Sequence, residues 1–419
     1  MIKHILKQIW TQRAVNALLW GELFLVTIFI WYIVDYLFVT ANTFYTPTGF
    51  NIEHTYKIRL DELPSESNEY ISLNKDKASS SEAFMTAINR IRNYAGVEAV
   101  SLSHAAYPYD GSESDNNFLK DTASVNMQVR RVTPDFFRVF KVTTPQGDIE
   151  PLVSAIAQEK SIVISKDAET EFMGNNRSAI GKTLTSIAKD STKYRVGGVT
   201  TFMRRSDFNK TYPCCFLGIK ESDIAKDTTS FYSHLEICIR VTPDVDHDFI
   251  THFRKDMTHQ LRVGNIFLLD VQSFADIRNS YLKMTGDIND LKSHLAVVFF
   301  LMVNIFLGII GTFWFRTAYR RGEMGLRIAL GSTRTSLRGL LIAEGLVLLT
   351  LAIIPAAVVS FNIGHADLVD VDRMDFTFMR FLIGIAITYL LMIGMIILGI
   401  WYPARQAMKI QPAEVLHEQ

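Results

Sequence analysis

Long apolar runs dominate the hydrophobic pattern of this 419-residue chain. Three runs carry almost no charge, and a fourth, near the N-terminus, is interrupted only by Glu22 and Asp35. These two acids lie near the ends of the run, where we expect water to reach them. The four runs are 17–39, 295–315, 340–359 and 381–401. A helix of about 20 residues spans the roughly 30 Å hydrocarbon layer of a bilayer. The pattern therefore predicts four transmembrane helices.

The first run has an alternative interpretation as a cleaved signal peptide, because Lys3, Lys7 and Arg13 precede it. Its apolar part is too long for a signal peptide, it contains two acids, and no small-residue cleavage site follows, so we interpret it as an anchor. Before it, residues 2–10 place apolar side chains on one helical stripe, which is typical of a helix lying on a membrane. We therefore expect residues 1–39 to form an amphipathic helix and the first span.

Basic residues predict the topology. The connection between the second and third spans contains one acid, Glu323, and six arginines: Arg316, Arg320, Arg321, Arg327, Arg334 and Arg338. The next connection is acidic, with Asp367, Asp370, Asp372 and Asp375 against Arg373. Because basic loops stay in the cytoplasm, this asymmetry places both termini and the arginine-rich loop inside the cell. Residues 40–293 then lie outside.

The outer segment mixes the periodicities of strands and helices, and two strand-helix-strand units bracket it, at 56–102 and 235–271. Such units predict an α/β domain in which one lobe is split by the insertion of another. The predicted boundaries are 40–273 for the domain, 50–130 with 232–272 for the split lobe, and 131–231 for the inserted lobe. The fold class is a membrane protein with four transmembrane α-helices and a large α/β extracytoplasmic domain between the first and second spans.

A heptad seam runs from the outer domain toward the second span. Its members are spaced alternately three and four apart: Phe274, Ile277, Tyr281, Met284, Ile288, Leu291 and Leu295. We expect one continuous helix from Phe274 to Phe315, with a stalk over 274–293, weakened by about 1 kcal/mol at Gly286. A surface helix packed on its own domain would show the same stripe.

Candidate chemistry in the outer domain is sparse. The segment AIGKTL lacks the first glycine of a phosphate-binding loop, since Asn176 stands in its place, and no other nucleotide, zinc-protease or serine-hydrolase motif is present. We therefore expect neither enzymatic activity nor a cofactor in this chain. The formal net charge of zero gives no reason to expect a nucleic-acid partner.

Cysteine and histidine leave two questions open. Cys238 could bridge Cys214 or Cys215 on the oxidising side of the membrane, and buried free thiols are the alternative. His252 and His259 share a helical face, but they lack the convergent ligands of a metal site, so we expect a solvated surface.

The arginine-rich loop, 316–338, is predicted to contain a short amphipathic helix. Its arginines recur at helical spacing, and Glu323 is placed to pair with Arg320 and Arg327. Gly331 is expected to end the helix. Such a helix at the membrane face could bind another protein, or it could serve only as a topology anchor on lipid headgroups.

Four groups of motifs carry a family resemblance. The stretch RRGEMGLRIALGSTRTSLRGLLIAEGLVLL, with Glu344 early in the third span, and the C-terminal WYPARQAMKIQPAEVLHEQ resemble the FtsX-like permease domain of ABC transporters. In the outer domain, VRRVTPDFFRVF, SIVISKDAETEFMG, IGKTL and YRVGGVTTFMRRSDF resemble the periplasmic core domain of MacB-type permeases. The resemblance implies a permease domain over 294–402 and a cytoplasmic tail over 403–419.

The resemblance also implies how the chain works. It implies a permease subunit in a bacterial inner membrane that forms a homo- or heterodimer and binds a separate cytoplasmic ABC ATPase, which holds the ATP. The loop would dock on that ATPase through Arg320, Arg321, Glu323, Met324, Gly325, Arg327, Ala329, Leu330 and Gly331. ATP hydrolysis would move the periplasmic domains for export or efflux, with a periplasmic adaptor and an outer-membrane channel as further partners. The alternative output is signalling, in which the permease controls an envelope enzyme or a sensor kinase.

Overall fold

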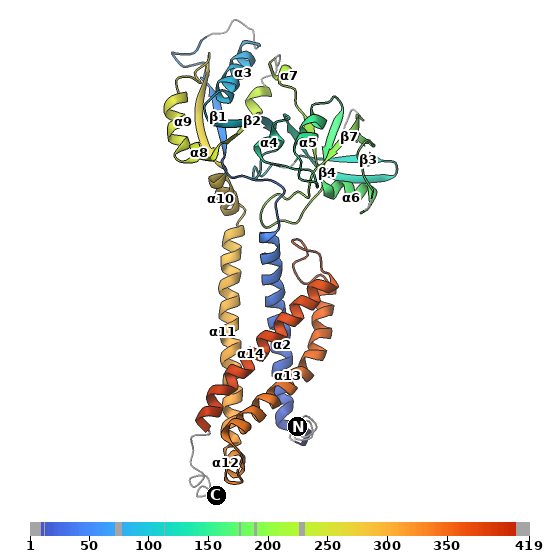
Figure 1. The fold of residues 1–419 in the computed structure, drawn as a ribbon, viewed down its shortest axis with the longest axis vertical. Helices are drawn as coiled ribbons and strands as arrows, with labels where there is room; N and C mark the ends of the chain where they lie inside the picture. Colours follow the sequence, from blue (N-terminus) through green and yellow to red (C-terminus); the bar gives the residue numbers. More distant parts are fainter. Residues whose placement is uncertain are drawn as a thin grey trace. The chain divides into compact units, whose positions relative to one another are not determined.

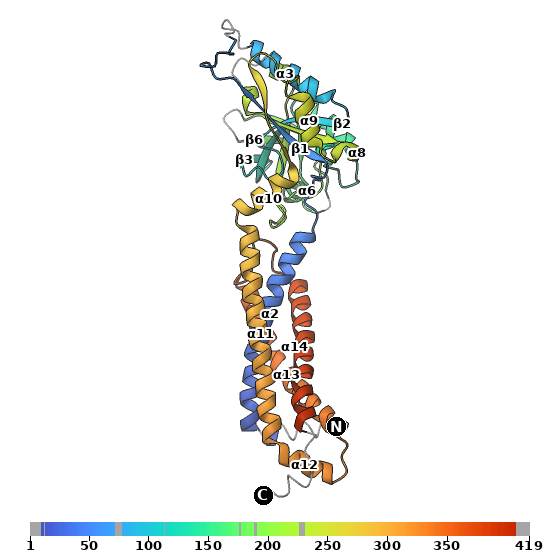
Figure 2. The same ribbon diagram turned by 90° about the vertical axis from the view of Figure 1, so that its left-hand side faces the viewer.

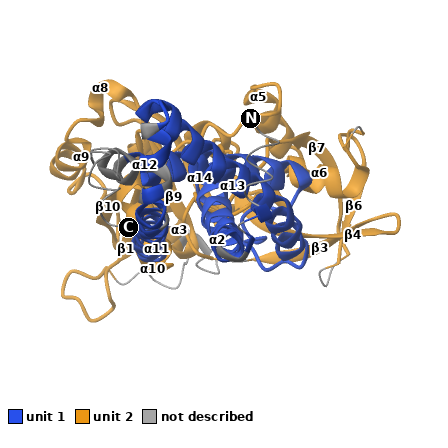
Figure 3. Ribbon diagram, turned by 90° about the horizontal axis from the view of Figure 1, so that it is seen from below, with its two compact units in different colours: residues 1–44, 288–419 blue, residues 45–287 orange. Residues whose placement is uncertain are grey.

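The computed structural model describes most of the chain in two compact units, residues 1–44 with 288–419 and residues 45–287 (Figure 3). The described residues are 10–11, 13–71, 78–112, 114–175, 177–187, 191–225 and 231–407. The predicted surface helix at 2–10 and the tail beyond 407 lie almost wholly outside them.

The first unit is helical. Its long helices are α2 (Arg13–Tyr45), α11 (Asp287–Tyr319), α13 (Arg334–His365) and α14 (Phe378–Ala407), drawn in Figures 1 and 2. Each is long and apolar enough to cross a membrane, which confirms the four predicted spans. A shared apolar core joins them, with Leu23, Phe313, Leu348 and Ile396 among its members.

Close helix contact depends on small residues in this unit. A side chain at Gly345 of α13 would meet Ile396 of α14 at 3.0 Å and Phe313 of α11 at 3.3 Å. Helices in lipid associate mainly through close packing, since the lipid supplies no hydrophobic force between them. A glycine at such a position allows this packing because it has no side chain in the way. Gly345 therefore leaves room for side chains of α14 and α11 to pack against α13.

The second unit contains two lobes, and the first is a four-stranded antiparallel sheet. Its elements are β1 (Thr55–Glu62), α3 (Ala78–Arg92), β2 (Val97–His104), β9 (Glu236–Val241), α8 (Pro243–Asp246), α9 (Phe249–Met257) and β10 (Ile266–Ser273). The strand order β10-β1-β9-β2 is that of a split β-α-β layer. Alternate residues such as Ile58, Leu102 and Ile239 pack beneath α3 and α9.

The second lobe is a closed barrel inserted between β2 and β9. Its strands are β3 (Asp115–Lys120), β4 (Ala123–Val132), β5 (Ser161–Ile164), β6 (Thr183–Ser186), β7 (Lys193–Val199) and β8 (Cys214–Gly218). The order β4-β3-β6-β7-β5-β8 returns to its start because β8 also pairs with β4. Since β3 and β4 belong to this ring, the inserted lobe begins before residue 131, where the sequence analysis placed its boundary.

Shorter elements complete the second unit. They are α4 (Phe136–Val139), α5 (Glu150–Ile156), α6 (Lys166–Met173), α7 (Glu221–Ala225), the 3-10 helix η1 (Phe231–His234) and α10 (Phe274–Met284). An aromatic cluster that includes Phe136, Phe216 and Phe274 joins α4, the barrel and α10. This cluster fixes the start of α10 on the domain.

The predicted continuous helix from Phe274 to Phe315 is wrong. Helix α10 ends at Met284 with Thr285 as its C-cap, Gly286 takes a left-handed φ of 83°, and α11 begins at Asp287. Glycine terminates a helix in this conformation because it has no Cβ to clash, so here it separates two helices rather than weakening one. The proposed stalk, 274–293, therefore spans a break.

The first half of the heptad seam packs on its own domain, as the alternative interpretation held. Phe274 is buried and Ile277 packs against the same core, whereas Met284 is exposed. Leu282, which lies outside the seam, is buried instead.

Candidate functional site

A short helix, α12 (Arg321–Ala329), occupies the arginine-rich loop and confirms the predicted secondary structure there. Its C-terminus has paired capping bonds: the Gly331 N–H donates to the Ile328 carbonyl and the Ser332 N–H donates to the Arg327 carbonyl. Gly331 has a φ of 96°, which suits glycine and explains the stop read from the sequence. The hydroxyl of Thr333 then caps the start of α13.

The start of α12 is fixed by a buried ion pair. Arg320 Nη1 lies 2.7 Å from Glu344 Oε2 of α13, and both side chains are almost fully buried. Removing one partner of such a pair leaves an uncompensated buried charge, so the pair locks the start of α12 to α13. The predicted pairing of Arg320 with Glu323 involves a side chain outside the described ones and stays a prediction; the pair that the structure describes is Arg320–Glu344.

The predicted docking residues differ in exposure. Leu330 is 79% exposed, whereas Gly325 and Arg327 are half-buried. Leu326, which was not among the predicted residues, is 56% exposed. Gly331 is exposed and Arg320 is buried. The side chains of Arg321, Glu323, Met324 and Ala329 lie outside the described ones. The loop therefore presents two leucines at its surface, while Arg320 is held inside.

Asp35 of α2 is not solvated as the sequence analysis expected, because it forms a bidentate ion pair with Arg380 of α14. Arg380 Nε and Nη2 lie 2.8 and 2.6 Å from the two carboxylate oxygens, and the side chains are 0% and 2% exposed. Arg380 Nη1 also donates to the carbonyls of Asp370 and Met374 in the connection between α13 and α14. One arginine thus joins two spans and a loop.

Glu22, at the other end of α2, is also bound by protein. Its carboxylate oxygens accept from the Thr312 hydroxyl of α11 at 2.9 and 3.1 Å. Helix α2 is therefore hydrogen-bonded to α11 near one end and ion-paired to α14 near the other. Neither acid needs the water that the sequence analysis assigned to it.

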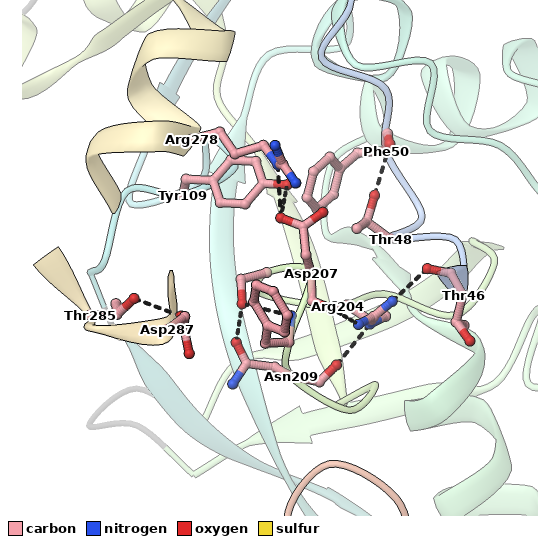
Figure 4. A network of polar contacts seen from close by, with 12 residues as sticks. Thr46, Thr48, Phe50, Tyr109, Arg204, Asp207, Asn209, Arg278, Thr285 and Asp287 are labelled. Carbon is pink, nitrogen blue, oxygen red and sulfur yellow. Dashed lines mark hydrogen bonds and ion pairs between the residues drawn. The ribbon is translucent and has the colours of Figure 1, made fainter. Parts of the chain in front are cut away.

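The loop 203–209 of the extracytoplasmic domain binds two segments: residues 46–48, which follow α2 in the chain, and helix α10, which precedes α11 (Figure 4). The buried Arg204 donates to the carbonyls of Thr46, Asp207 and Asn209, and its backbone N–H donates to the Thr48 carbonyl. Asp207 accepts from Arg278 of α10 at 2.8 Å, and this hydrogen bond raises the pKa of Arg278.

A second buried arginine fixes the same incoming segment. Arg240 of β9 donates to the carbonyls of Asn51, Glu53 and Val139 at 2.6 to 2.9 Å. Burial lowers the pKa of Arg240 and of Arg204, since each donates mainly to carbonyl oxygens rather than to a carboxylate. Residues 46–53 are consequently tied to both lobes.

Family models match both parts of the chain. The MacB-like periplasmic core domain matches residues 41–248, and the FtsX-like permease C-terminal domain matches residues 295–412. The chain is an FtsX-like permease of the MacB type. It is thus an ABC transporter permease, a component that is typically non-enzymatic, and membership of the family implies an ABC ATPase partner and dimerisation.

Solved extracytoplasmic domains are also similar to this permease. The extracellular domain of the noncanonic ABC-type transporter YknZ from Gram-positive bacteria is 15% identical, with a TM-score of 0.31, and the match covers 51% of this chain and 100% of that one. The periplasmic region of MacB from Actinobacillus actinomycetemcomitans is 12% identical, with a TM-score of 0.32, and the match covers 55% and 94%. The comparison with curated proteins found no match.

The three cysteines of the permease are buried free thiols. Cys214 and Cys238 lie in one apolar cluster and Cys215 lies in the barrel core. Burial raises the pKa of the Cys214 thiol to about 11, so it is protonated at neutral pH. Among the described residues, no group of three or more His, Cys, Asp or Glu side chains could hold a metal ion.

Proposed function

We propose that this permease couples ATP hydrolysis by a separate cytoplasmic ABC ATPase to movement of its extracytoplasmic domain, for export or efflux. The observation that carries the proposal is the combination of two exposed leucines, Leu326 on α12 and Leu330 just after it, with the buried Arg320–Glu344 pair at the start of the helix. A docking element must offer apolar surface to its partner, and it must be attached firmly enough to pass on a displacement. Helix α12 and its ion pair meet both needs.

Polar anchors support transmission through the spans. A displacement of α13 reaches α14 and α11 through the close packing around Gly345, and it reaches α2 through Asp35–Arg380 and Glu22–Thr312. Buried polar partners of this kind resist separation, because parting them leaves a charge or donor unsatisfied in lipid. The four spans would then respond as one body.

The remaining parts of the proposal concern partners and place. The permease works in a bacterial inner membrane as a homo- or heterodimer, with α12 and both termini in the cytoplasm, where the positive-inside rule puts its arginines. ATP is bound by the ATPase and not by this chain. A periplasmic adaptor and an outer-membrane channel complete an export route.

Cysteine crosslinking tests the docking step. In the full-length chain expressed in cells, we expect Leu330→Cys to crosslink to a protein that mass spectrometry identifies as an ABC ATPase. Leu368→Cys, also well exposed at 65% but in the connection between α13 and α14, is the matched control and should give no such product. The reverse pattern, or labelling of Leu330→Cys by a membrane-impermeant maleimide added outside the cell, would refute the proposal.

A further inference from the structure

The barrel lobe has no chain connection of its own to the spans. It is inserted between β2 and β9, so the chain enters and leaves it through strands of the split lobe. The two segments that lead to spans also belong to the split lobe: residues 46–54 run from α2 into β1, and β10 continues into α10, which is followed by α11. Movement of the spans therefore reaches the barrel lobe either through the split lobe or through direct contacts with these two segments.

Loop 203–209 supplies such direct contacts, and its own backbone is fixed in the barrel lobe. It lies between β7 and β8, where Arg204 forms a β-bridge with Thr211. The Met203 N–H donates to a carboxylate oxygen of Asp167 in α6 at 3.2 Å. Met203 and Arg204 are almost completely buried. The loop is therefore a packed part of the barrel lobe that reaches both segments.

The two segments are held by different chemistry (Figure 4). Arg204 holds the incoming segment through a main-chain group, the carbonyl of Thr46. Helix α10 is held by a side chain: Asp207 Oδ2 accepts from Arg278 Nε at 2.8 Å and from the Tyr109 hydroxyl at 3.2 Å. Tyr109 lies between β2 and β3, where the chain enters the barrel lobe. One carboxylate thus joins the loop, α10 and the entry to the barrel.

Apolar packing also joins α10 to the barrel lobe, but it does not fix a direction. Phe274 of α10 and Phe216 of β8 lie in the same buried cluster. Burial of apolar surface is non-directional, so such rings can slide while they stay buried, whereas a charge-assisted hydrogen bond is short and directional. The side chains of Asp207 and Arg278 are 13% and 28% exposed, so solvent screens the pair only in part. The ion pair therefore sets the position of α10 against the loop.

We propose that Asp207 and Arg278 are positioning residues that carry the barrel lobe along with α10 when the spans move, an inference that rests on the proposed function. Arg204 performs the same task for the incoming segment. The loop is then a clasp through which both connections deliver their movement to the barrel lobe. Without the ion pair, α10 moves while the barrel lobe follows through sliding apolar contacts and the short pairing of β2 with β4.

Electron spin resonance tests the clasp in the full-length permease in detergent. Nitroxides at Ser280→Cys on α10 and Ile180→Cys in the barrel lobe occupy exposed positions, and the native thiols are buried. Dilution with unlabelled chains leaves one labelled chain in each dimer. We expect a narrow distance distribution in the wild-type background and a broader one in Arg278→Gln. Lys283→Gln, exposed on the same helix, is the matched control and should leave the width unchanged.

Labels in both chains of the dimer test transmission during ATP turnover. With the ATPase, ATP and vanadate present, the distance between two Ser280→Cys labels should shift in the wild-type background and in Arg278→Gln alike. The distance between two Ile180→Cys labels should shift in the wild-type background and should lose most of that shift in Arg278→Gln. Arg278→Lys, which keeps the charge, should restore part of it. A general loss of stability would not separate the two label positions in this way.

Three results would overturn the proposal. They are an unchanged width between positions 280 and 180 in Arg278→Gln, equal broadening by Lys283→Gln, and a full shift at position 180 in Arg278→Gln during turnover. A Ser280→Cys pair that does not shift in the wild-type background would instead refute the proposed function, and the widths would then decide whether the clasp positions the barrel lobe. Should Arg278→Gln fail to fold, Asp207→Asn takes its place, because it removes the charge and keeps the shape; an unchanged width in that variant would also refute the proposal.

Discussion

Breaking the ion pair between Asp35 and Arg380 should loosen the membrane unit by a measurable free energy. The pair contains two charge-assisted hydrogen bonds, at 2.8 and 2.6 Å, between side chains that are almost completely buried. Each such bond contributes about 1.5–3 kcal/mol, and losing one partner of a buried pair costs about 3–5 kcal/mol. We therefore expect Asp35→Asn and Arg380→Gln each to lower the free energy of unfolding by about 3 kcal/mol.

The double variant tests whether the two residues act together. Once one charge is gone, the other no longer has a partner to lose, so the double variant should cost little more than either single one. This corresponds to a coupling free energy of about 2–3 kcal/mol. Asp372→Asn is the control, because Asp372 is exposed in the same connection that Arg380 holds, and it should change stability by less than about 0.5 kcal/mol.

Tryptophan fluorescence during unfolding in mixed detergent and dodecyl sulfate is a suitable assay. All five tryptophans of the chain lie in the membrane unit, and Trp31 packs on Phe381, next to Arg380. The signal therefore reports the unit that contains the pair. Single-variant costs below about 1 kcal/mol, or costs that simply add in the double variant, would refute the reasoning.

Three further predictions concern other sites. Glu344→Gln should abolish stimulation of the partner ATPase by the permease in proteoliposomes while the complex still assembles, because it releases Arg320 from α13. Full stimulation would argue against transmission of a displacement from α12 to α13 through this pair. Arg204→Gln should lower the free energy of unfolding of the extracytoplasmic domain by about 3 kcal/mol, because three carbonyls lose their donor, whereas the half-buried neighbour Arg205→Gln should cost less than about 1 kcal/mol in the same thermal scan. The free energy of unfolding should fall as pH rises from about 9 toward 11, because the Cys214 thiol releases its proton in the unfolded chain and keeps it in the folded one. In denaturant titrations, Cys214→Ala should remove part of this dependence of stability on pH. An unchanged dependence would contradict the assigned pKa.

The parts of the fold that depend on local pattern could be predicted from the sequence. Apolar length alone identifies the four spans, and the arginine spacing with Gly331 identifies α12. The strands of the split lobe follow from alternation, since one face of that sheet packs under α3 and α9. These features need no knowledge of which segments meet.

The features that were missed depend on contacts between distant segments. Asp35 and Arg380 are far apart in the chain, and Arg380 stands at the edge of an apolar run, so nothing in the local pattern pairs them. Closure of the barrel by β4 and β8 is likewise non-local and shifted the lobe boundary. The break at Gly286 was hidden because the heptad spacing continues across it, and spacing does not report the sign of φ.

The most direct test of the central claim measures movement of the extracytoplasmic domain during ATP turnover. Ile180→Cys offers an exposed label site, and the native thiols are buried, so a nitroxide can be attached selectively in both chains of the dimer. With the ATPase present, adding ATP and vanadate should shift the electron spin resonance distance distribution between the two labels, and Glu344→Gln should abolish the shift. An unchanged distribution in the wild-type complex while ATP is hydrolysed would contradict the account.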